Sequence, residues 1–432
     1  MFRKTLMAAA ALLAMATSAN AATQITWWHA MDGALGDVVN TLADRFNKSQ
    51  DEYEIVPINK GSYQETMTAG IAAFRAKNQP NIIQIFDAGA ATIINAKGAV
   101  LPVQELLESD GVKFDINNYI PGVRYFYADA DGKMIGMPFN SSTPLLYFNK
   151  DAFAKAGIEN PPKTWQEFET IAPKLKEAGY TGLAQSMSTW IFFENFMSRH
   201  NLPLATENNG YDGTDAKLLY NNKDLKAFWS NVKKWKDEGY YGYYGRDWGP
   251  NQDAFLQQKV AMWIGSSGSF GGLRKSAQFK FGAAELPYVA GVGDAPTHTF
   301  IGGAALFALS GHPAEENKGV AKFFEFLTQP DIQYYWHKET GYVPITNAAY
   351  ELAQKDGYYK ESPDAEVGIK QLSEKGGEWT KGYRLGFYPQ IRNVIYGEVD
   401  KMLSGEETVD AAFDTIETQG NALLKRFHDT YK

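Results

Sequence analysis

The chain contains no cysteine among its 432 residues. This absence excludes disulfide bonds, a thiolate nucleophile and thiolate metal ligands. Histidine is also scarce, because the sequence has six and no two of them form a close pair at metal-ligand spacing. We therefore expect no metal site and no cofactor, and a core large enough to be stable without disulfides.

Positive charge is the minority sign in the sequence. There are 42 lysine and arginine residues against 50 aspartate and glutamate residues, a formal net charge of −8. Removal of residues 1–21 makes the charge −10, because Arg3 and Lys4 are the only charged residues of that segment. An acidic chain does not attract nucleic acid over a distance, so we expect no nucleic-acid partner. An anionic ligand has to be recognised by groups close to it.

Long hydrophobic runs are absent except near the N-terminus. There Arg3 and Lys4 precede the apolar residues 6–16, and the small residues Ala19 and Ala21 follow. The run is shorter than the ~20 residues of a membrane-spanning helix, which makes a membrane anchor the weaker alternative. Basic, apolar and small residues in this order are typical of a secretory signal peptide. We expect cleavage after Ala21 and export of a soluble mature chain.

The first part of the mature chain alternates strands with helices. Strands are expected at residues 24–28, 53–58 and 81–86, the last nearly all apolar, as in a strand covered on both faces. Two helical patterns lie between them, one with an apolar face over 35–46 and one carrying Met67, Ile71 and Phe74 on one side. This βαβαβ order predicts a mostly parallel α/β sheet.

Ligands of such sheets bind beyond the carboxyl ends of the strands. Residues 27–29, 61–63 and 87–89 lie at or just beyond the carboxyl ends of the three expected strands. We expect these three segments to share one rim of the sheet.

A second unit begins near Pro138. A strand is expected at 145–148, a helix at 165–178 after a proline-rich loop, and further strands at 279–283 and 304–309. The simplest topology has the chain crossing between two lobes near 138–142, 265–270 and 310–320. No low-complexity linker interrupts the chain. The expected division is a signal peptide at 1–21, one lobe from 22–139 plus 268–318, and a second lobe from 140–267 plus 319–432.

The motifs of common enzymes are incomplete. Residues 265–269 (GSSGS) lack the glycine that a nucleophile elbow needs two places after its serine. Residues 291–294 (GVGD) lack the third glycine of a nucleotide-binding loop. Glu194 and Glu325 are acids that glycoside hydrolysis could use in principle, but a charged helix face is the expected role. The sequence therefore favours a binding protein over an enzyme.

Several segments carry a family resemblance that runs from about Trp27 to the end of the chain. They are 149–151 (NKD), 161–165 (PPKTW), 341–346 (GYVPIT), 69–75 (AGIAAFR), 138–144 (PFNSSTP), 208–215 (NNGYDGTD) and 389–392 (PQIR). In these segments the chain resembles the extracytoplasmic solute-binding proteins of the maltose-like cluster, in particular those that bind sn-glycerol-3-phosphate for bacterial ABC importers. The resemblance implies a periplasmic monomer with two α/β lobes, joined by a hinge, that close on a small molecule and present it to a membrane permease.

The resemblance also implies a set of ligand contacts. Carried over position by position, they are Tyr63, Asp87, Ser142, Trp190, Ser266, Gly303, Tyr342 and Arg392. The set suits a glycerol phosphate, because Arg392 can offer a guanidinium fork to phosphate oxygens and the hydroxyls and the Gly303 amide are neutral donors. Asp87 is suited to accept from glycerol hydroxyls, and Trp190 gives an apolar wall.

Two positions depart from the family's pattern. Asp87 stands where the family has glutamate, and Met187 stands where it has the first of two tryptophans, of which Trp190 is kept. Methionine in place of a rigid indole predicts a wider and softer wall. The expected ligand is therefore sn-glycerol-3-phosphate or a glycerophosphodiester such as glycerophosphocholine. A neutral oligosaccharide as the ligand, and hydrolysis of glycerophosphodiesters, are the alternatives.

Overall fold

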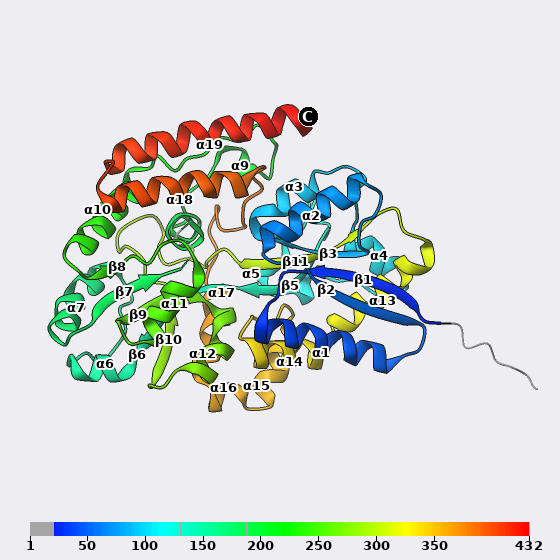
Figure 1. Cartoon of the computed structure of the whole chain (residues 1–432), viewed down its shortest axis with the longest axis horizontal. Helices are drawn as coiled ribbons and strands as arrows, with labels where there is room; N and C mark the ends of the chain where they lie inside the picture. Colours follow the sequence, from blue (N-terminus) through cyan, green and yellow to red (C-terminus); the bar gives the residue numbers. More distant parts are fainter. Residues whose placement is uncertain (1–20, 130, 187–188, 432) are drawn as a thin grey trace, which may run out of the picture.

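The computed structural model describes residues 21–129, 131–186 and 189–431. The chain forms two α/β lobes side by side, each around its own sheet (Figure 1), which confirms the expected fold class. Within the described residues the first sheet has six strands in the order β2-β1-β3-β11-β4, with β5 also paired to β11. Its strands are β1 (Thr23–His29), β2 (Tyr53–Asn59), β3 (Ile82–Phe86), β4 (Val100–Leu101), β5 (Met137–Ser142) and β11 (Gly302–Leu309). Strands β1, β2 and β3 are parallel, as their βαβαβ order predicted.

Helices cover both faces of the first sheet (Figure 1). Trp27 of β1 and Phe46 of α1 both pack against Phe323 of α13, with ring centroids 5.4 and 5.2 Å apart. On the opposite face, α2 approaches β3 closely at Gly70, where a Cβ would lie 2.2 Å from the Ile83 side chain. The helices of this lobe are α1 (Gly33–Ser49), α2 (Tyr63–Arg75), α3 (Ala90–Ile94), α4 (Val103–Ser109), α5 (Pro121–Arg124), α13 (Ala314–Leu327), α14 (Pro330–Thr340), α15 (Asn347–Lys355) and α16 (Tyr358–Glu361).

The second sheet has five strands within the described residues, in the order β10-β6-β9-β7-β8. They are β6 (Pro144–Asn149), β7 (Thr181–Gln185), β8 (Tyr241–Gly242), β9 (Val260–Ser266) and β10 (Phe281–Glu285). The surrounding helices are α6 (Lys150–Lys155), α7 (Trp165–Glu177), α8 (Asn195–Arg199), α9 (Thr206–Gly210), α10 (Lys223–Asp237), α11 (Trp248–Leu256), α12 (Phe270–Ser276), α17 (Val367–Leu372), α18 (Tyr388–Ser404) and α19 (Val409–Tyr431). Helix α7 begins where the sequence predicted, because Thr164 and Glu167 form a capping box.

The chain crosses between the lobes at points that differ in part from those expected. At the first crossing, β5 ends at Ser142 in the first sheet and β6 begins at Pro144 in the second. The segment 281–285, expected in the first lobe, pairs with β6 of the second sheet instead. The chain then returns to the first sheet at Gly302, and α13 and α14 stay with that sheet. The strands expected at 279–283 and 304–309 follow one another with no change of composition between them. The sequence therefore does not show that they join different sheets.

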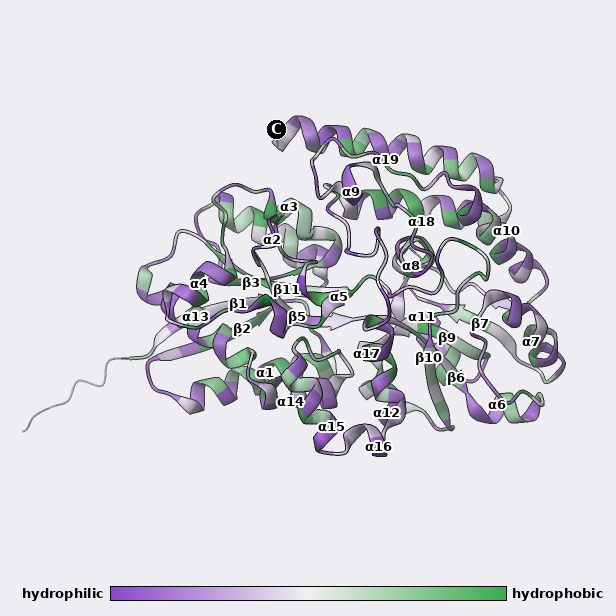
Figure 2. Ribbon diagram, turned by 180° about the vertical axis from the view of Figure 1, so that it is seen from behind, coloured by the Kyte–Doolittle hydropathy of each residue, from purple (hydrophilic) through white to green (hydrophobic). Residues whose placement is uncertain are grey.

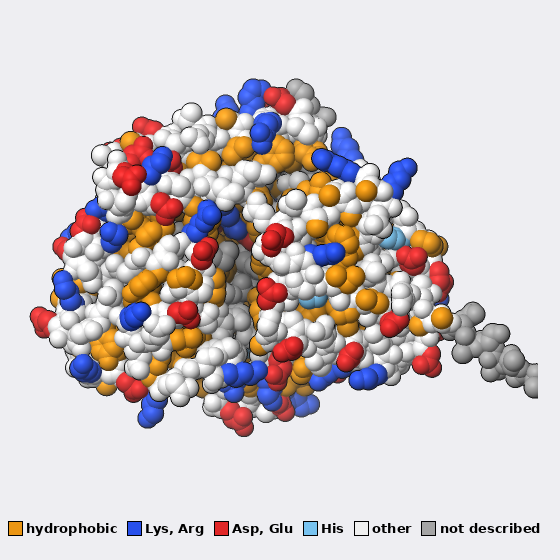
Figure 3. Space-filling view, in the orientation of Figure 1, with side chains coloured by type: hydrophobic (Ala, Val, Ile, Leu, Met, Phe, Trp, Pro, Cys, Tyr) orange, Lys and Arg blue, Asp and Glu red, His pale blue; other side chains and the backbone are white. Residues whose placement is uncertain are grey.

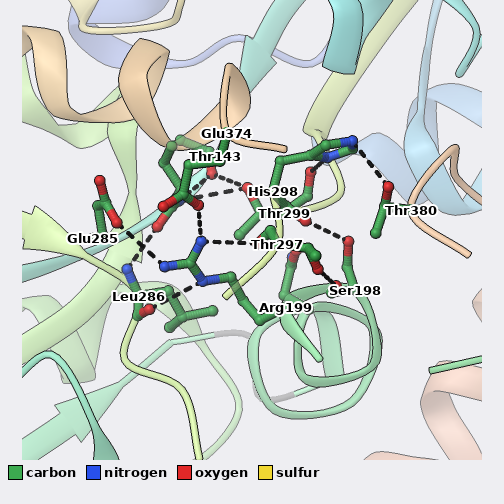
Figure 4. A network of polar contacts seen from close by, with 12 residues as sticks. Thr143, Ser198, Arg199, Glu285, Leu286, Thr297, His298, Thr299, Glu374 and Thr380 are labelled. Carbon is green, nitrogen blue, oxygen red and sulfur yellow. Dashed lines mark hydrogen bonds and ion pairs between the residues drawn. The ribbon is translucent and has the colours of Figure 1, made fainter. Parts of the chain in front are cut away.

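A buried arginine ties the crossing segments together (Figure 4). Arg199, at the end of α8, donates to the carbonyl oxygens of Thr297 at 2.8 Å and Leu286 at 3.3 Å. It also forms ion pairs with Glu285 and Glu374. Burial and the nearby Glu285 raise the pKa of Glu374 to about 7, against the opposing effect of Arg199.

Hydropathy follows this architecture. The strands of both sheets are mainly hydrophobic, and the long α19 alternates hydrophilic and hydrophobic residues (Figure 2). Among the described residues, every helix is too short or too polar to cross a membrane. Residues 1–20 of the signal peptide expected at 1–21 lie outside the described residues.

Candidate functional site

The first crossing brings three of the expected contacts together. Ser142 pairs with Gly302, next to Gly303, in the first sheet, and two residues later Pro144 pairs with Ser266 in the second. The Ser266 hydroxyl accepts a hydrogen bond from the Gly268 amide at 3.0 Å, so its own hydrogen remains available to a ligand. The two sheets thus present serine side chains at the line where they meet.

Gly303 allows a close approach of two backbones at this line. Its φ is +91°, and a Cβ there would lie 1.8 Å from the carbonyl oxygen of Asn140 on the paired strand. Only glycine fits such a position without strain.

Two tyrosines from separate segments meet at Asn140. The Asn140 side-chain amide donates to the Tyr63 hydroxyl at 2.7 Å, and Gln84 holds the amide in place by donating to its oxygen at 2.8 Å. Tyr342 interacts with both Asn140 and Tyr63, and its ring packs on Gly268, where a Cβ would lie 2.7 Å away. Burial raises the pKa of both phenols, so each keeps its proton. Because the two hydroxyls are hydrogen-bonded to each other, one hydrogen of the pair is used between them and the other is available to a ligand.

Arg392 forms the charged part of the site. It extends from α18, and its Nη2 lies 2.5 Å from Asp87 Oδ2 while its Nε donates to Glu194 Oε1 at 2.8 Å. Tyr383 donates to the same Asp87 oxygen at 2.8 Å. The Arg392 and Asp87 side chains are each 6% exposed and that of Glu194 is fully buried. Asp87 follows β3 and α18 packs on the second lobe, so this triad joins the two lobes.

The triad carries one positive and two negative groups. Burial raises the pKa of Glu194, and Arg392 offsets this in part. The expectation that Arg392 presents a free fork to phosphate needs correction, because both carboxylates already occupy it in this structure. The interpretation of Glu194 as an exposed helix-face acid was wrong, since the side chain turns inward from the π-helical turn Trp190–Glu194.

Trp190 stands between the two parts of the site. Its ring packs on the first sheet at Gly302, where a Cβ would lie 2.4 Å from the indole. The residue is 3% exposed, and its Nε1 has no hydrogen-bond partner among the described residues. The tryptophan therefore extends from the second lobe and forms an apolar wall of the site. Met187, the expected partner on this wall, lies outside the described residues.

All eight expected contacts lie along the boundary between the lobes, where Figure 3 shows a hollow in the surface. Three further residues belong to the same cluster: Asn140, Glu194 and Tyr383. Asn140 lies inside the quoted segment 138–144, which was the available signal for it. Nothing in the sequence around Tyr383 pointed to the site.

The chain is similar in sequence to known proteins over its whole length. The family model described as bacterial extracellular solute-binding protein matches residues 41–366. The sn-glycerol-3-phosphate-binding periplasmic protein UgpB of Pectobacterium atrosepticum is 43% identical and aligns over 99% of this chain and 97% of its own length. That of Yersinia enterocolitica is also 43% identical, over 100% and 99%.

Solved structures share the fold. UgpB from Mycobacterium tuberculosis, in complex with glycerophosphocholine, superposes with a TM-score of 0.78 at 23% identity and covers 94% of this chain and 99% of its own. The cyclic alpha-maltosyl-1,6-maltose binding protein from Arthrobacter globiformis reaches a TM-score of 0.76 at 22% identity, covering 94% and 100%. On its fold, its family model and its full-length relatives, the chain belongs to the bacterial extracellular solute-binding proteins.

Proposed function

We propose that the chain captures sn-glycerol-3-phosphate, or a glycerophosphodiester such as glycerophosphocholine, between its lobes and delivers it to the membrane permease of an ABC importer. The observation that carries this proposal is the pairing of a cluster of neutral donors with a buried acid–arginine pair at one boundary. Full-length relatives that are 43% identical are named as sn-glycerol-3-phosphate-binding periplasmic proteins, which supports the first of these ligands.

Charge decides which end of the ligand lies where. The triad of Asp87, Glu194 and Arg392 has a formal charge of −1, so a phosphate dianion beside it would be repelled. The hydroxyls of Ser266, Tyr63 and Tyr342 have donor hydrogens and no negative charge, and we place the phosphate among them, together with Ser142 and Gly303. The glycerol hydroxyls then lie at Asp87 and Arg392, which supply one acceptor and one donor.

Transport follows from contacts on both lobes. Tyr63 and Asp87 belong to the first lobe, whereas Trp190, Ser266 and Arg392 belong to the second. A ligand that touches both lobes has its highest affinity for the closed form, so it shifts the population toward closure. The crossing segments around Ser142 absorb the motion as a hinge. The permease then meets a closed, loaded protein.

A calorimetric titration tests the ligand class. We expect sn-glycerol-3-phosphate and glycerophosphocholine to bind, and glycerol, inorganic phosphate and maltose to give little heat, since each lacks one half of the recognised group. Tight maltose binding without binding of either phosphate compound would overturn the proposal in favour of an oligosaccharide. Tight glycerol-3-phosphate binding with no glycerophosphocholine binding would refute the wider wall that we attribute to Met187.

Two further parts of the proposal have their own tests. The protein binds its ligand without turning it over, so glycerophosphocholine incubated with the purified chain should stay intact, and release of choline or glycerol would contradict this. We also propose that the chain acts as a periplasmic monomer after cleavage behind Ala21. Intact-mass measurement of the exported protein should then find Ala22 at the N-terminus, and a mass that retains residues 1–21 would contradict it.

A further inference from the structure

A second pocket lies in the first lobe, apart from the boundary site. Its volume is about 300 Å³, within the range of small-molecule sites. It opens between α2 and α3 and reaches down to the sheet, where Ile83, Ile85 and Leu309 form its floor at 1%, 2% and 4% exposure. None of the eight expected ligand contacts lines it, and the structure describes all eight. The pocket is therefore a separate feature of the molecule.

The walls of the pocket are apolar and come from both ends of the chain. Met67, Ile71 and Phe74 of α2 form one side, and Phe387 and Tyr431 close it from the C-terminal helices, whose end lies over α2 and α3 (Figure 1). This is the stripe that the sequence placed on one side of α2, but the sheet is covered by Thr66 and Gly70 instead. Ile71, at 39% exposure, is the only exposed large hydrophobic side chain among the described residues.

The polar groups of the pocket are donors. Arg75, at the end of α2, and Lys97, just after α3, are exposed lining residues, and neither forms an ion pair within the part of the chain that the structure describes. No aspartate or glutamate among the described residues lines the pocket. Thr92 is 9% exposed, and its hydroxyl has no hydrogen-bond partner among the described residues. An apolar slot with two cations and a free hydroxyl has the complement of an anionic amphiphile.

We propose that this pocket binds a medium-chain carboxylate. The apolar chain lies between α2 and α3 on the sheet floor, and the carboxylate is held at the exposed rim by Arg75 and Lys97. The volume equals about ten water-sized volumes of ~30 Å³ each, which suits a chain of about eight to ten carbons. A slot that passes between two helices to the sheet favours a slender chain over a folded protein surface.

Calorimetric titration with octanoate, decanoate and dodecanoate tests the chain. Each pair of added methylene groups should tighten binding about tenfold until the pocket is full, after which the gain should stop. Decanol and decyltrimethylammonium test the head group. Decanol should bind at least about tenfold more weakly than decanoate, because it lacks the charge that Arg75 and Lys97 meet. Equal affinity of decanol and decanoate, or no binding by any of the three carboxylates, overturns the proposal.

Variants locate the site. Ala96→Trp fills the slot from its wall and should abolish decanoate binding. Arg75→Gln with Lys97→Gln should weaken decanoate at least about tenfold and leave decanol unchanged. Lys113→Gln with Lys223→Gln removes the same charge from two exposed sites elsewhere and should change neither.

Folding is checked for every variant by its circular dichroism melting curve, which is independent of any ligand in the boundary site. Decanoate binding that persists in a folded Ala96→Trp variant overturns the proposal. Loss of decanoate binding in the Lys113 and Lys223 control to the same degree overturns it as well.

Discussion

Replacing Arg392 with methionine should strand two buried carboxylates. The guanidinium bonds to Glu194 at 2.8 Å, Asp87 at 2.5 Å and the Tyr383 hydroxyl at 3.1 Å, all within a region that is at least 94% buried. Methionine has a similar length and is apolar, so the change removes the charge and leaves most of the packing. Asp87 and Glu194 then lack their cation.

The size of the effect follows from the burial. Breaking a buried ion pair by removing one partner costs about 3–5 kcal/mol, because the remaining charge stays desolvated. The deficit should depend on pH. Burial already raises the pKa of Glu194, and loss of Arg392 raises it further. A carboxyl whose pKa is raised on folding stabilises the fold while it is protonated, and this contribution is lost as the pH rises through the raised pKa. The deficit should therefore be smaller at pH 5 than at pH 8.

Urea unfolding followed by circular dichroism at pH 5, 6.5 and 8 measures this deficit. The double variant Arg392→Met with Glu194→Gln is the matched control, because it removes one stranded carboxylate while its amide keeps the shape, and it should recover about 2 kcal/mol at pH 8. Calorimetry on the single variant should show loss of glycerol-3-phosphate binding. A deficit below about 1 kcal/mol, or one that is the same at pH 5 and pH 8, would refute the reasoning.

Three other predictions rest on different parts of the structure. Gly303→Ala should lower the melting temperature by several degrees and abolish glycerol-3-phosphate binding, because φ is +91° and the new Cβ would lie 1.8 Å from a carbonyl oxygen. The control Gly397→Ala lies in open space on α18 and should be neutral or stabilising by up to about 1 kcal/mol. Similar melting curves for the two variants would contradict this prediction. The pKa of Glu374 is raised to about 7, so the stability of the native protein should fall by up to about 3 kcal/mol as the pH rises from 4.5 through 7. In thermal melts, Glu374→Gln should flatten this dependence of stability on pH. An unchanged dependence would contradict the raised pKa of Glu374. Stability should depend on pH in the opposite direction at the fully buried His337, whose pKa is lowered by burial to about 4. The stability that the neutral imidazole contributes above pH 6.5 is lost as the pH falls through 4. In thermal melts, His337→Gln should be less stable than the native protein at pH 7 but should lose less stability on acidification.

Much of the local structure was predictable because its causes are local. The capping pair Thr164 and Glu167 marks the start of α7, and the apolar spacing of residues 35–46 marks the buried face of α1, where Val38, Val39, Leu42 and Phe46 are all buried. The parallel order of β1, β2 and β3 follows from their βαβαβ sequence. Short-range capping and side-chain periodicity act within one or two turns, so a single sequence carries them.

The sequence predicted residues that the structure places along one boundary, but it did not predict how they bond to one another. Eight contacts carried over from the family all lie along the lobe boundary, yet Glu194 was assigned to a helix face and Arg392 to a free ligand fork. An acid in a helical pattern faces solvent or core according to packing from distant segments, which its own neighbours do not encode. The same limit applies to the strand expected at 279–283, which forms at 281–285 but joins the second sheet instead of the first.

The sequence by itself determined an exported-protein pattern, an α/β alternation, the absence of cysteine chemistry and a family pattern spread over the chain. Only the tertiary structure decided that Arg392 is held by Asp87, 305 positions away, and by Glu194, 198 positions away. It also decided that the apolar stripe of α2 lines a pocket. Both outcomes depend on how the two lobes and the C-terminal helices pack. Segments distant in the sequence bury these side chains and so set their charge states, and the neighbouring residues in the sequence do not encode that burial.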